Sequence, residues 1–240
     1  RKDIHNSDIP LVCQACEARH GGICAALNPD QLTELNKYTK RTVHEPGSNL
    51  NTVEMEAGSY ANILGGVVKL TKLMADGRQQ IVGLQFAPDF LGRPFLETNN
   101  VTAEASVTTR LCSFPKKVID DFVSDVPEME HILYEQSLRE LDEARDWMLM
   151  LGRKSALEKV ASFLLLILMN NDPERENNTY PITIELPLKR GDIADFLGVT
   201  IETVSRQLTN LRKNGVIEIV DRKSVTINSA ERLKSAAGDI

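Results

Sequence analysis

The chain has 240 residues, of which 42% are hydrophobic and 26% are charged, and its net charge is −6. This length predicts two domains with a connector, and the composition is that of an ordinary folded protein. The acidic balance argues against a protein that coats nucleic acid through bulk positive charge, and no apolar run approaches the roughly 20 residues that cross a bilayer.

The N-terminal residues Arg1–Pro10 are polar and lack the apolar core of a secretory signal. The most apolar run of the chain, Phe163–Met169, is short and predicts a buried helix. We therefore expect a cytoplasmic protein with no membrane partner. Structural disulfides are not expected in it, because the cytoplasm keeps thiols reduced.

A cysteine-rich segment is predicted within residues 1–30. Cys13 and Cys16 form a C-x2-C pair, Cys24 follows after seven further residues, and Cys112 stands alone later in the chain. Four thiolates satisfy either a tetrahedral zinc ion or a cubane iron–sulfur cluster, and a thiol switch is a third alternative. The spacing alone does not choose among the three.

The loop between Cys16 and Cys24 contains Gly21-Gly22, which lets the chain turn back so that Cys24 can join the pair. His20 lies in the same loop. Because four cysteines are available as ligands, we expect His20 to face solvent.

Residues 31–125 predict a small β-domain that begins with a short helix at Gln31–Thr42. Short runs of strand-forming residues follow, separated by turns. Two of these runs, Gly66–Leu70 and Gln80–Leu84, flank Asp76-Gly77-Arg78 as the strands of a hairpin would, so we interpret these three residues as a turn. Many short strands at close spacing indicate a sandwich or a small barrel.

A long helix is predicted from Pro127 to about Gly152, in a connector of residues 126–153. A candidate dimer seam on it has the alternating steps of four and three that are typical of a coiled coil: Tyr134, Leu138, Leu141, Arg145 and Met148. Acidic neighbours such as Glu140 and Asp146 would repel across a parallel dimer. The pattern is compatible with an amphipathic helix packed on its own domain and with a dimer helix of marginal stability.

Residues 154–240 carry the clearest pattern in the chain. After a helix predicted at Lys154–Asn170, the segments Leu188–Leu197 and Ile201–Lys213 predict two helices joined by a tight turn. Single residues support this: a small Ala194 at the helix contact, Gly198 for a positive φ, Thr200 as a cap, and Val204, Leu208 and Leu211 as a buried face. The pattern predicts a helix-turn-helix.

The second of these helices would present its outward residues to the major groove of DNA. We predict that Arg206 donates to guanine, that Glu202 accepts from the opposite-strand base, and that Ser205 discriminates within the half-site. Candidates for phosphate contacts are Arg190, Thr200, Arg212 and Lys213. Two further runs, Val216–Val220 and Ser224–Ile227, predict a wing around a basic turn. Double-stranded DNA is therefore the expected partner, against the alternative of a helical hairpin that binds no nucleic acid.

Together these motifs resemble the Crp/Fnr superfamily of bacterial transcription regulators, and within it the Fnr-type oxygen sensors, over essentially the whole chain. The segments Arg190–Ala194, Leu197-Gly198 and Glu202–Arg206 are similar to the helix-turn-helix signature of that family. The four cysteines fall where Fnr-type proteins carry their cluster ligands. The gap before Cys24 is similar to that of alphaproteobacterial members.

The resemblance implies an α+β fold with an N-terminal cupin-like β-barrel sensory domain, a long dimerisation helix and a C-terminal winged helix-turn-helix. It implies a [4Fe–4S] cluster that oxygen destroys, and a homodimer that binds palindromic TTGAT-like sites. It also implies RNA polymerase as a partner, with loops around Asp76–Arg78 and Pro88–Phe95 as the candidate surfaces. A zinc-stabilised regulator of the same fold that does not sense oxygen is the alternative.

Three features depart from the superfamily pattern. Leu91–Leu96 lacks the phosphate cassette of the cyclic-nucleotide branch, so a cyclic nucleotide is not an expected ligand. Lys189 stands where relatives often place a capping Ser or Thr, and Gln207 where an apolar residue is common. Since no Ser-His-Asp order, glycine-rich phosphate loop or H-E-x-x-H motif stands out, we do not expect an enzyme.

Overall fold

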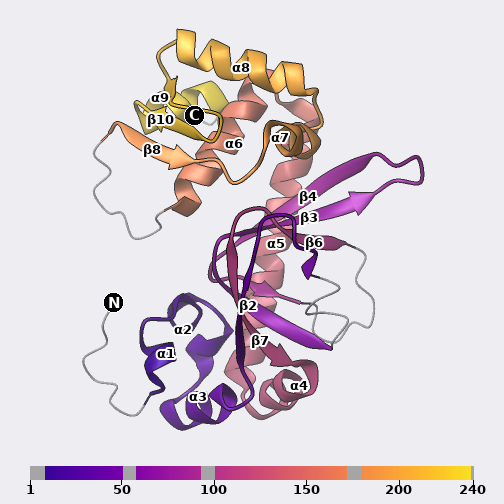
Figure 1. Cartoon of the computed structure of the whole chain (residues 1–240), viewed down its shortest axis with the longest axis vertical. Coiled ribbons are helices and arrows are strands. Elements are labelled where there is room, and N and C mark those ends of the chain that lie inside the picture. Colours follow the sequence, from indigo (N-terminus) through magenta and orange to yellow (C-terminus); the bar gives the residue numbers. More distant parts are fainter. Residues whose placement is uncertain (1–8, 51–57, 93–100, 172–179, 239–240) are drawn as a thin grey trace. The chain divides into compact units, whose positions relative to one another are not determined.

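The structure is a computed structural model, and it describes residues 9–50, 58–92, 101–171 and 180–238. The chain divides into two compact units, residues 1–75 with 82–142 and residues 76–81 with 143–240 (Figure 1). The finer division at residues 30, 125 and 153 stays a prediction. Of the sequence predictions, most of the polar N-terminus and the part of the cassette from Arg93 to Leu96 lie outside the described residues.

The first unit opens with four short helical elements and a strand: α1 (Leu11–Gln14), α2 (Glu17–Gly21), the 3-10 helix η1 (Ile23–Ala26), α3 (Pro29–Asn36) and β1 (Lys40–His44). A capping box starts α3. The side chain of Asn28 accepts from the backbone N–H of Gln31, and the side chain of Gln31 accepts from the backbone N–H of Asn28. The predicted helix at Gln31–Thr42 is right in its first half only. Its second half is wrong, because pairing with a distant strand makes that part β1.

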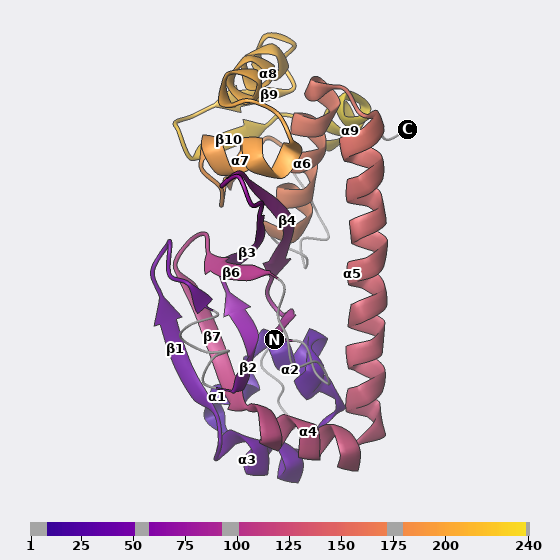
Figure 2. The ribbon, with the colours of Figure 1, turned by 90° about the vertical axis from the view of Figure 1, so that its right-hand side faces the viewer.

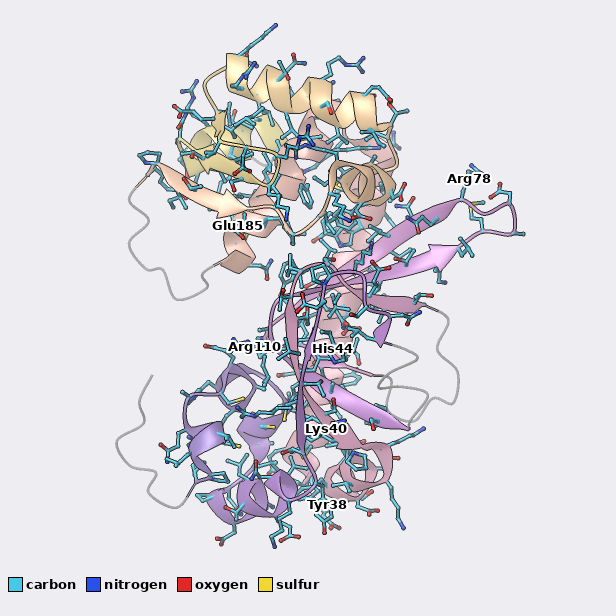
Figure 3. The ribbon with its side chains drawn as sticks, viewed as in Figure 1. Tyr38, Lys40, His44, Arg78, Arg110 and Glu185 are labelled. Carbon is cyan, nitrogen blue, oxygen red and sulfur yellow. The ribbon has the colours of Figure 1, made fainter. Side chains whose placement is uncertain are left out.

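The other strands of this unit form two sheets, in the orders β1-β7-β2-β5 and β4-β3-β6. They are β2 (Ser59–Gly65), β3 (Val67–Leu73), β4 (Gln79–Phe86), β5 (Phe90–Leu91), β6 (Thr102–Ala105) and β7 (Thr109–Pro115). The hairpin predicted around Gly77 is confirmed: Gly77 has φ 86°, and the Asp76 carboxylate accepts from the Arg78 backbone N–H at 3.1 Å. Figure 3 labels Arg78 at the end of the hairpin.

Side chains alternate between the two faces of the β1-β7-β2-β5 sheet, and the central strands β2 and β7 are buried on both faces, whereas β1 is mostly exposed. Ala61, Ile63 and Leu111 belong to one core, which they share with Val68 of β3. Tyr60, Cys112 and Phe114 belong to the other core, which also takes in residues of α3, of α4 (Lys116–Asp125) and of α5 (Pro127–Arg153). The sheet therefore holds Cys112 between β-strands and helices, in the same core as the buried face of α5.

The helix predicted from Pro127 is confirmed as α5, which runs without a break for 27 residues (Figure 2). Met129 and Leu133 are buried on one of its faces. Within the described parts of the chain, no helix is both long and apolar enough to cross a membrane.

The second unit contains a three-stranded sheet in the order β8-β10-β9 and four helices besides the end of α5. Its elements are α6 (Ala156–Asn171), β8 (Ile182–Glu185), α7 (Arg190–Leu197), α8 (Ile201–Lys213), β9 (Ile217–Ile219), β10 (Ser224–Ile227) and α9 (Ala230–Ala237). The helix-turn-helix and the wing are confirmed, whereas β8 and α9 were not predicted. Phe196 of α7 packs edge-on against Trp147 of α5 and Phe163 of α6, with ring centroids 4.5 and 5.9 Å away.

The turn between α7 and α8 depends on Gly198, which has φ 62° and ψ 41°. A Cβ atom added there would meet only Leu151 Cδ2, at 3.6 Å, which is ordinary van der Waals contact. A side chain at this position would therefore destabilise the fold through its backbone conformation, because there is room for the side chain itself.

Gly198→Ala should lower the free energy of unfolding by about 1 kcal/mol, because a non-glycine residue is strained in the left-handed region. Urea denaturation measures this through Trp147, the one tryptophan of the chain, which packs on α7. Gly191→Ala is the matched control, since Gly191 is in helix α7 and a Cβ there meets only Ile201 at 3.8 Å. A loss of stability in the control as large as that in Gly198→Ala would contradict this account.

Candidate metal centre and nucleic-acid interface

All four cysteines line one pocket of the first unit. Cys13 lies on α1, Cys16 is the N-cap of α2, Cys24 lies on η1, and Cys112 comes from β7. All four are free thiols. The structure thus brings together the set of residues that the sequence predicted as metal ligands.

Gly22 makes the return of Cys24 to the pocket sterically feasible. A Cβ atom at Gly22 would lie 2.9 Å from the carbonyl oxygen of Pro88 and 3.0 Å from that of Ala18, closer than side chains approach backbone. The chain can therefore end α2 and start η1 here only with glycine. His20 is exposed and is not among the residues that line the pocket, as predicted.

Arg41 and Asn62 flank Cys112 across the sheet. Arg41 of β1 and Asn62 of β2 both pair with Cys112 of β7, so the three side chains share one face of the sheet. The Asn62 amide, 1% exposed, donates to the Cys24 sulfur at 3.4 Å, and the Arg41 guanidinium donates to the carbonyl of Val12. Strand and loop thus meet at the pocket through polar groups.

Arg41 and Asn62 could not be recognised as pocket residues from their local sequence. Arg41 falls in the segment for which the sequence predicts a helix, and Asn62 lies in an ordinary strand-forming run. Only the register of β1 and β2 against β7 places them beside Cys112.

Burial changes the acidity of the pocket thiols. It raises the pKa of Cys112 to about 11, opposed by the charge of Arg41 and reinforced by Cys16 and Cys13. Burial raises the pKa of Cys24 still further, and the other three cysteines add to that effect. These thiols are protonated at neutral pH, so a metal that binds them must displace protons.

The pocket has little room for a metal group in the arrangement of this structure. Among the described residues, no three His, Cys, Asp or Glu side chains stand close enough together to hold one metal ion. The free space between the cysteines is about 20 Å³, roughly that of one water molecule. The donor set matches four-thiolate chemistry, but binding requires Leu11–Ala26 to move relative to β7. The helices of that segment have only four or five residues each, so few intrahelical hydrogen bonds oppose such a movement.

The second candidate site is the exposed face of α8. Thr200 caps this helix by accepting from the Thr203 N–H at 3.3 Å, whereas Lys189 caps α7 without a side-chain hydrogen bond, as predicted. The predicted buried face is confirmed, since Val204, Leu208 and Leu211 are at most 2% exposed.

The candidate base-reading residues Glu202, Ser205 and Arg206 are all exposed, on the side of α8 away from that buried face. Arg206 donates to the Thr203 hydroxyl at 3.4 Å. Thr209 is half-buried and donates to the Ser205 carbonyl at 3.0 Å. The three residues are therefore free to meet a ligand that approaches α8 from outside the unit.

The candidate phosphate-binding residues differ in their surroundings. Thr200, Arg212 and Lys213 are exposed, at the two ends of α8. Arg190, the first residue of α7, is half-buried, and its Nη1 atom has no hydrogen-bond partner in the described part of the chain. An anion at α7 would satisfy this nitrogen.

The candidate dimer seam is an exposed apolar stripe along α5. Tyr134, Leu138, Leu141 and Met148 are 62, 43, 46 and 73% exposed, and Arg145 is exposed as well. The stripe lies on the face of the helix opposite Met129 and Leu133. Of the alternatives that the sequence left open, this exposure favours a helix whose seam is covered by a partner.

Comparison with known proteins identifies relatives over nearly the whole chain. Residues 158–236 match the model of the Crp-like helix-turn-helix domain. A "probable transcriptional activator" of Rhizobium leguminosarum is 47% identical over 234 residues, which are 98% of this chain and 96% of that protein. The "transcriptional activator protein FnrL" of Cereibacter sphaeroides is 37% identical, over 97% of this chain and 95% of the relative.

The fold has solved counterparts as well. The structure of FixK2 from Bradyrhizobium japonicum superposes with a TM-score of 0.72 at 27% identity, over 82% of this chain and 96% of that one. This likeness confirms the predicted fold class.

Iodoacetamide should modify Cys24 and Cys112 of the reduced, metal-free protein roughly 100-fold more slowly at pH 8 than Cys16, because thiolate is the reacting form and the first two are buried with raised pKa values. Cys13 should react at an intermediate rate, since burial raises its pKa as well but leaves it partly exposed. Mass spectrometry of the cysteine peptides measures the rates. In urea all four should react alike. Equal rates in the native protein would show that the pocket does not bury Cys24 and Cys112.

Proposed function

The chain belongs to the Crp/Fnr family of DNA-binding transcription regulators, and from that premise we propose that it responds to oxygen through a [4Fe–4S] cluster held by Cys13, Cys16, Cys24 and Cys112. The observation that carries this proposal is the convergence of the four cysteines on one pocket. The relatives are transcription regulators rather than enzymes, as the sequence predicted.

A cluster is proposed rather than zinc because the cysteine pattern resembles that of Fnr-type proteins, and a relative of this chain is named FnrL. A structural zinc ion would need all four sulfurs at about 2.3 Å from one centre, whereas a cubane would bind each thiolate through a different iron. With about 20 Å³ of free space between the cysteines, either group requires a movement of Leu11–Ala26, so the donor set rather than the present spacing supports the proposal. The alternative remains a zinc-stabilised regulator of the same fold that does not sense oxygen.

When bound, the cluster would supply a link that oxygen can break between the N-terminal segment and the sheet. Cys13, Cys16 and Cys24 belong to the segment and Cys112 to β7. Cys24 and Cys112 share a core with Met129 and Leu133 of α5. Ligation by all four would therefore hold the segment, the sheet and the first half of α5 in one arrangement.

The exposed stripe on α5 would form the interface of a homodimer. Its apolar side chains favour association, whereas exposed acidic neighbours such as Asp142 and Asp146 repel across a parallel pair. Glu140 is not part of that repulsion, because its carboxylate accepts from the buried amides of Gln85 and Gln136 on the side of α5 that faces the sheets. Beside it, α5 and α6 line a groove of about 400 Å³ with Leu149, Met150, Leu165 and Met169, which adds apolar surface. The balance makes dimerisation weak enough for the state of the cysteine pocket to control it.

In the dimer, two α8 helices would enter the major groove about one DNA turn apart, at a palindromic TTGAT-like site. Arg206 would donate to guanine, Glu202 would accept from the opposite strand, and Ser205 would discriminate within the half-site. Arg190, Thr200, Arg212 and Lys213 would contact phosphates. A monomer cannot bind both half-sites, so its affinity for the site is low.

Further partners follow from family membership. RNA polymerase is the proposed partner of the bound dimer, with the exposed Asp76–Arg78 turn as one candidate surface. The second loop, Pro88–Phe95, is described only to Gly92. The cassette lies partly outside the described residues, and a cyclic nucleotide is still not proposed as a ligand. The protein would act in the cytoplasm, where bacterial DNA lies.

Protein purified without air should contain about four irons and four sulfides per chain and should lose its visible absorption in air. Its dimerisation and its affinity for a palindromic site should fall together with the iron content. Iron and sulfide analysis, sedimentation and DNA binding before and after air measure these changes.

Cys24→Ser and His20→Ala are the matched variants, since both residues lie in the same loop and only Cys24 lines the pocket. Cys24→Ser should lose the iron, and His20→Ala should retain it. Zinc in place of iron, or equal DNA binding before and after air, would reject oxygen sensing and leave the DNA-binding function intact.

Arg206→Ala should cost about 1–3 kcal/mol on the specific site and relax the preference for guanine, because it removes a base contact. Lys213→Ala should weaken binding to specific and random DNA alike and reduce its dependence on salt, because it removes a phosphate contact. Titrations on both DNAs at several salt concentrations separate the two effects. If each variant lost the same affinity on both DNAs, the division of roles would be wrong.

A further inference from the structure

One row of residues crosses the β1-β7-β2-β5 sheet from the cysteine pocket to its edge. Arg41 pairs with Cys112, Cys112 with Asn62, and Asn62 with Phe90 of β5. Directly paired residues of antiparallel strands share a ladder and a face, so each side chain is a close cross-strand neighbour of the next. The row thus forms a continuous series of neighbours from Cys112 to Phe90.

The edge strand β5 is completed by a side chain of α5. Gln136 accepts from the Phe90 backbone N–H at 3.3 Å and donates to the Phe90 carbonyl at 3.2 Å. An edge strand has backbone groups without a neighbouring strand, and a primary amide can satisfy one donor and one acceptor as a strand would. The α5 helix is therefore attached to the sheet at the end of the row that starts from the pocket.

Gln136 is buried, at 9% exposure, on a helix whose buried face is otherwise apolar at Met129 and Leu133. Its amide also donates to Glu140, one turn further along, at 2.9 Å. On the other face of the same turns lie Tyr134, Leu138 and Leu141 of the candidate seam. Any shift of α5 at Gln136 therefore moves the seam as well.

We propose that Gln136 is the positioning residue through which the cysteine pocket controls the dimer surface of α5. This inference rests on the proposed function, because it assumes that the state of the pocket changes dimerisation. With the pocket ligated, the row holds β5 in place and Gln136 sets the position of α5. When the ligation is lost, the row relaxes, and α5 is no longer held in the orientation that favours the dimer.

Gln85 provides a matched control. It is also a buried glutamine, 8% exposed, and its amide also donates to α5, to Glu140 at 3.3 Å. It lies on β4, in the other sheet, outside the row that contains Cys112. Gln85→Leu and Gln136→Leu thus each remove a buried amide that donates to Glu140, and only Gln136→Leu also removes the contact between α5 and Phe90 of the row.

The experiment measures the dimer dissociation constant of the full chain by sedimentation, without air, for cluster-loaded and cluster-free protein. The ratio of the two constants reports the coupling between pocket and dimer. We expect a ratio of about tenfold or more in the wild type and in Gln85→Leu, and a ratio near one in Gln136→Leu with normal iron content. A residue that served stability alone would weaken both states equally and leave the ratio unchanged.

Three results would overturn the proposal. An unchanged ratio in Gln136→Leu, beside a normal wild-type ratio, rejects the role of Gln136 and leaves the proposed function standing. An equal fall of this ratio in Gln85→Leu would show that any loss of a contact to α5 uncouples the pocket from the dimer, whether or not it involves the row. A wild-type ratio near one, or a wild type that takes up no iron, rejects the control of dimerisation by the pocket, and the role of Gln136 with it.

If Gln136→Leu does not fold, Gln136→Asn replaces it. Asparagine keeps the amide but is one methylene shorter, so from the same helix position it cannot reach both backbone groups of Phe90. The ratio should again fall towards one, and amide hydrogen exchange at Phe90 should become faster in the cluster-free protein. Wild-type values of both quantities would overturn the proposal.

Discussion

The pairing of β7 with both β1 and β2 is the constraint on which the rest of the first unit depends. It holds Cys112 in the interior of a sheet, between Arg41 and Asn62, while the other three cysteines lie on a short helical segment outside the sheet. A group bound by all four thiols must join two parts of the chain that are otherwise held by a few polar contacts and by packing in a shared core. Binding or loss of such a group at the pocket would therefore change how firmly the N-terminal segment is held to the sheet.

The α5 helix has two faces with opposed requirements. One face is buried against the sheet domain and includes the polar Gln136 and the apolar Met129 and Leu133. The other face exposes apolar side chains among acidic residues. The acidic residues weaken association with a second copy of the helix, and the apolar side chains are unfavourable in water. Such a helix suits a regulated contact, because a few kcal/mol of coupling changes the fraction of dimer by orders of magnitude.

The second unit presents the proposed base-reading residues on one face of one helix. Val204, Leu208 and Leu211 fix α8 against the unit, and the left-handed Gly198 sets the turn before it. Glu202, Ser205 and Arg206 are left exposed in a defined orientation, since the buried and exposed positions alternate at helical spacing. A rigid helix that presents a few polar side chains is how a helix-turn-helix reads bases without rearrangement of its own fold.

The α5, α7 and α8 helices, the hairpin at Gly77, the wing and the four candidate ligands were predictable from the chain alone, because periodicity, caps, glycine turns and cysteine spacing are visible in the sequence. The end of α3 at Asn36 and the start of β1 after it were not predictable, and neither were β8 and α9. These elements depend on pairing and packing with distant segments. Nor could the sequence show that Arg41, Asn62 and Gln136 matter. Their roles depend on strand register and on which face of α5 meets the sheet, and only the tertiary structure decides these, because each joins residues tens of positions apart in the chain.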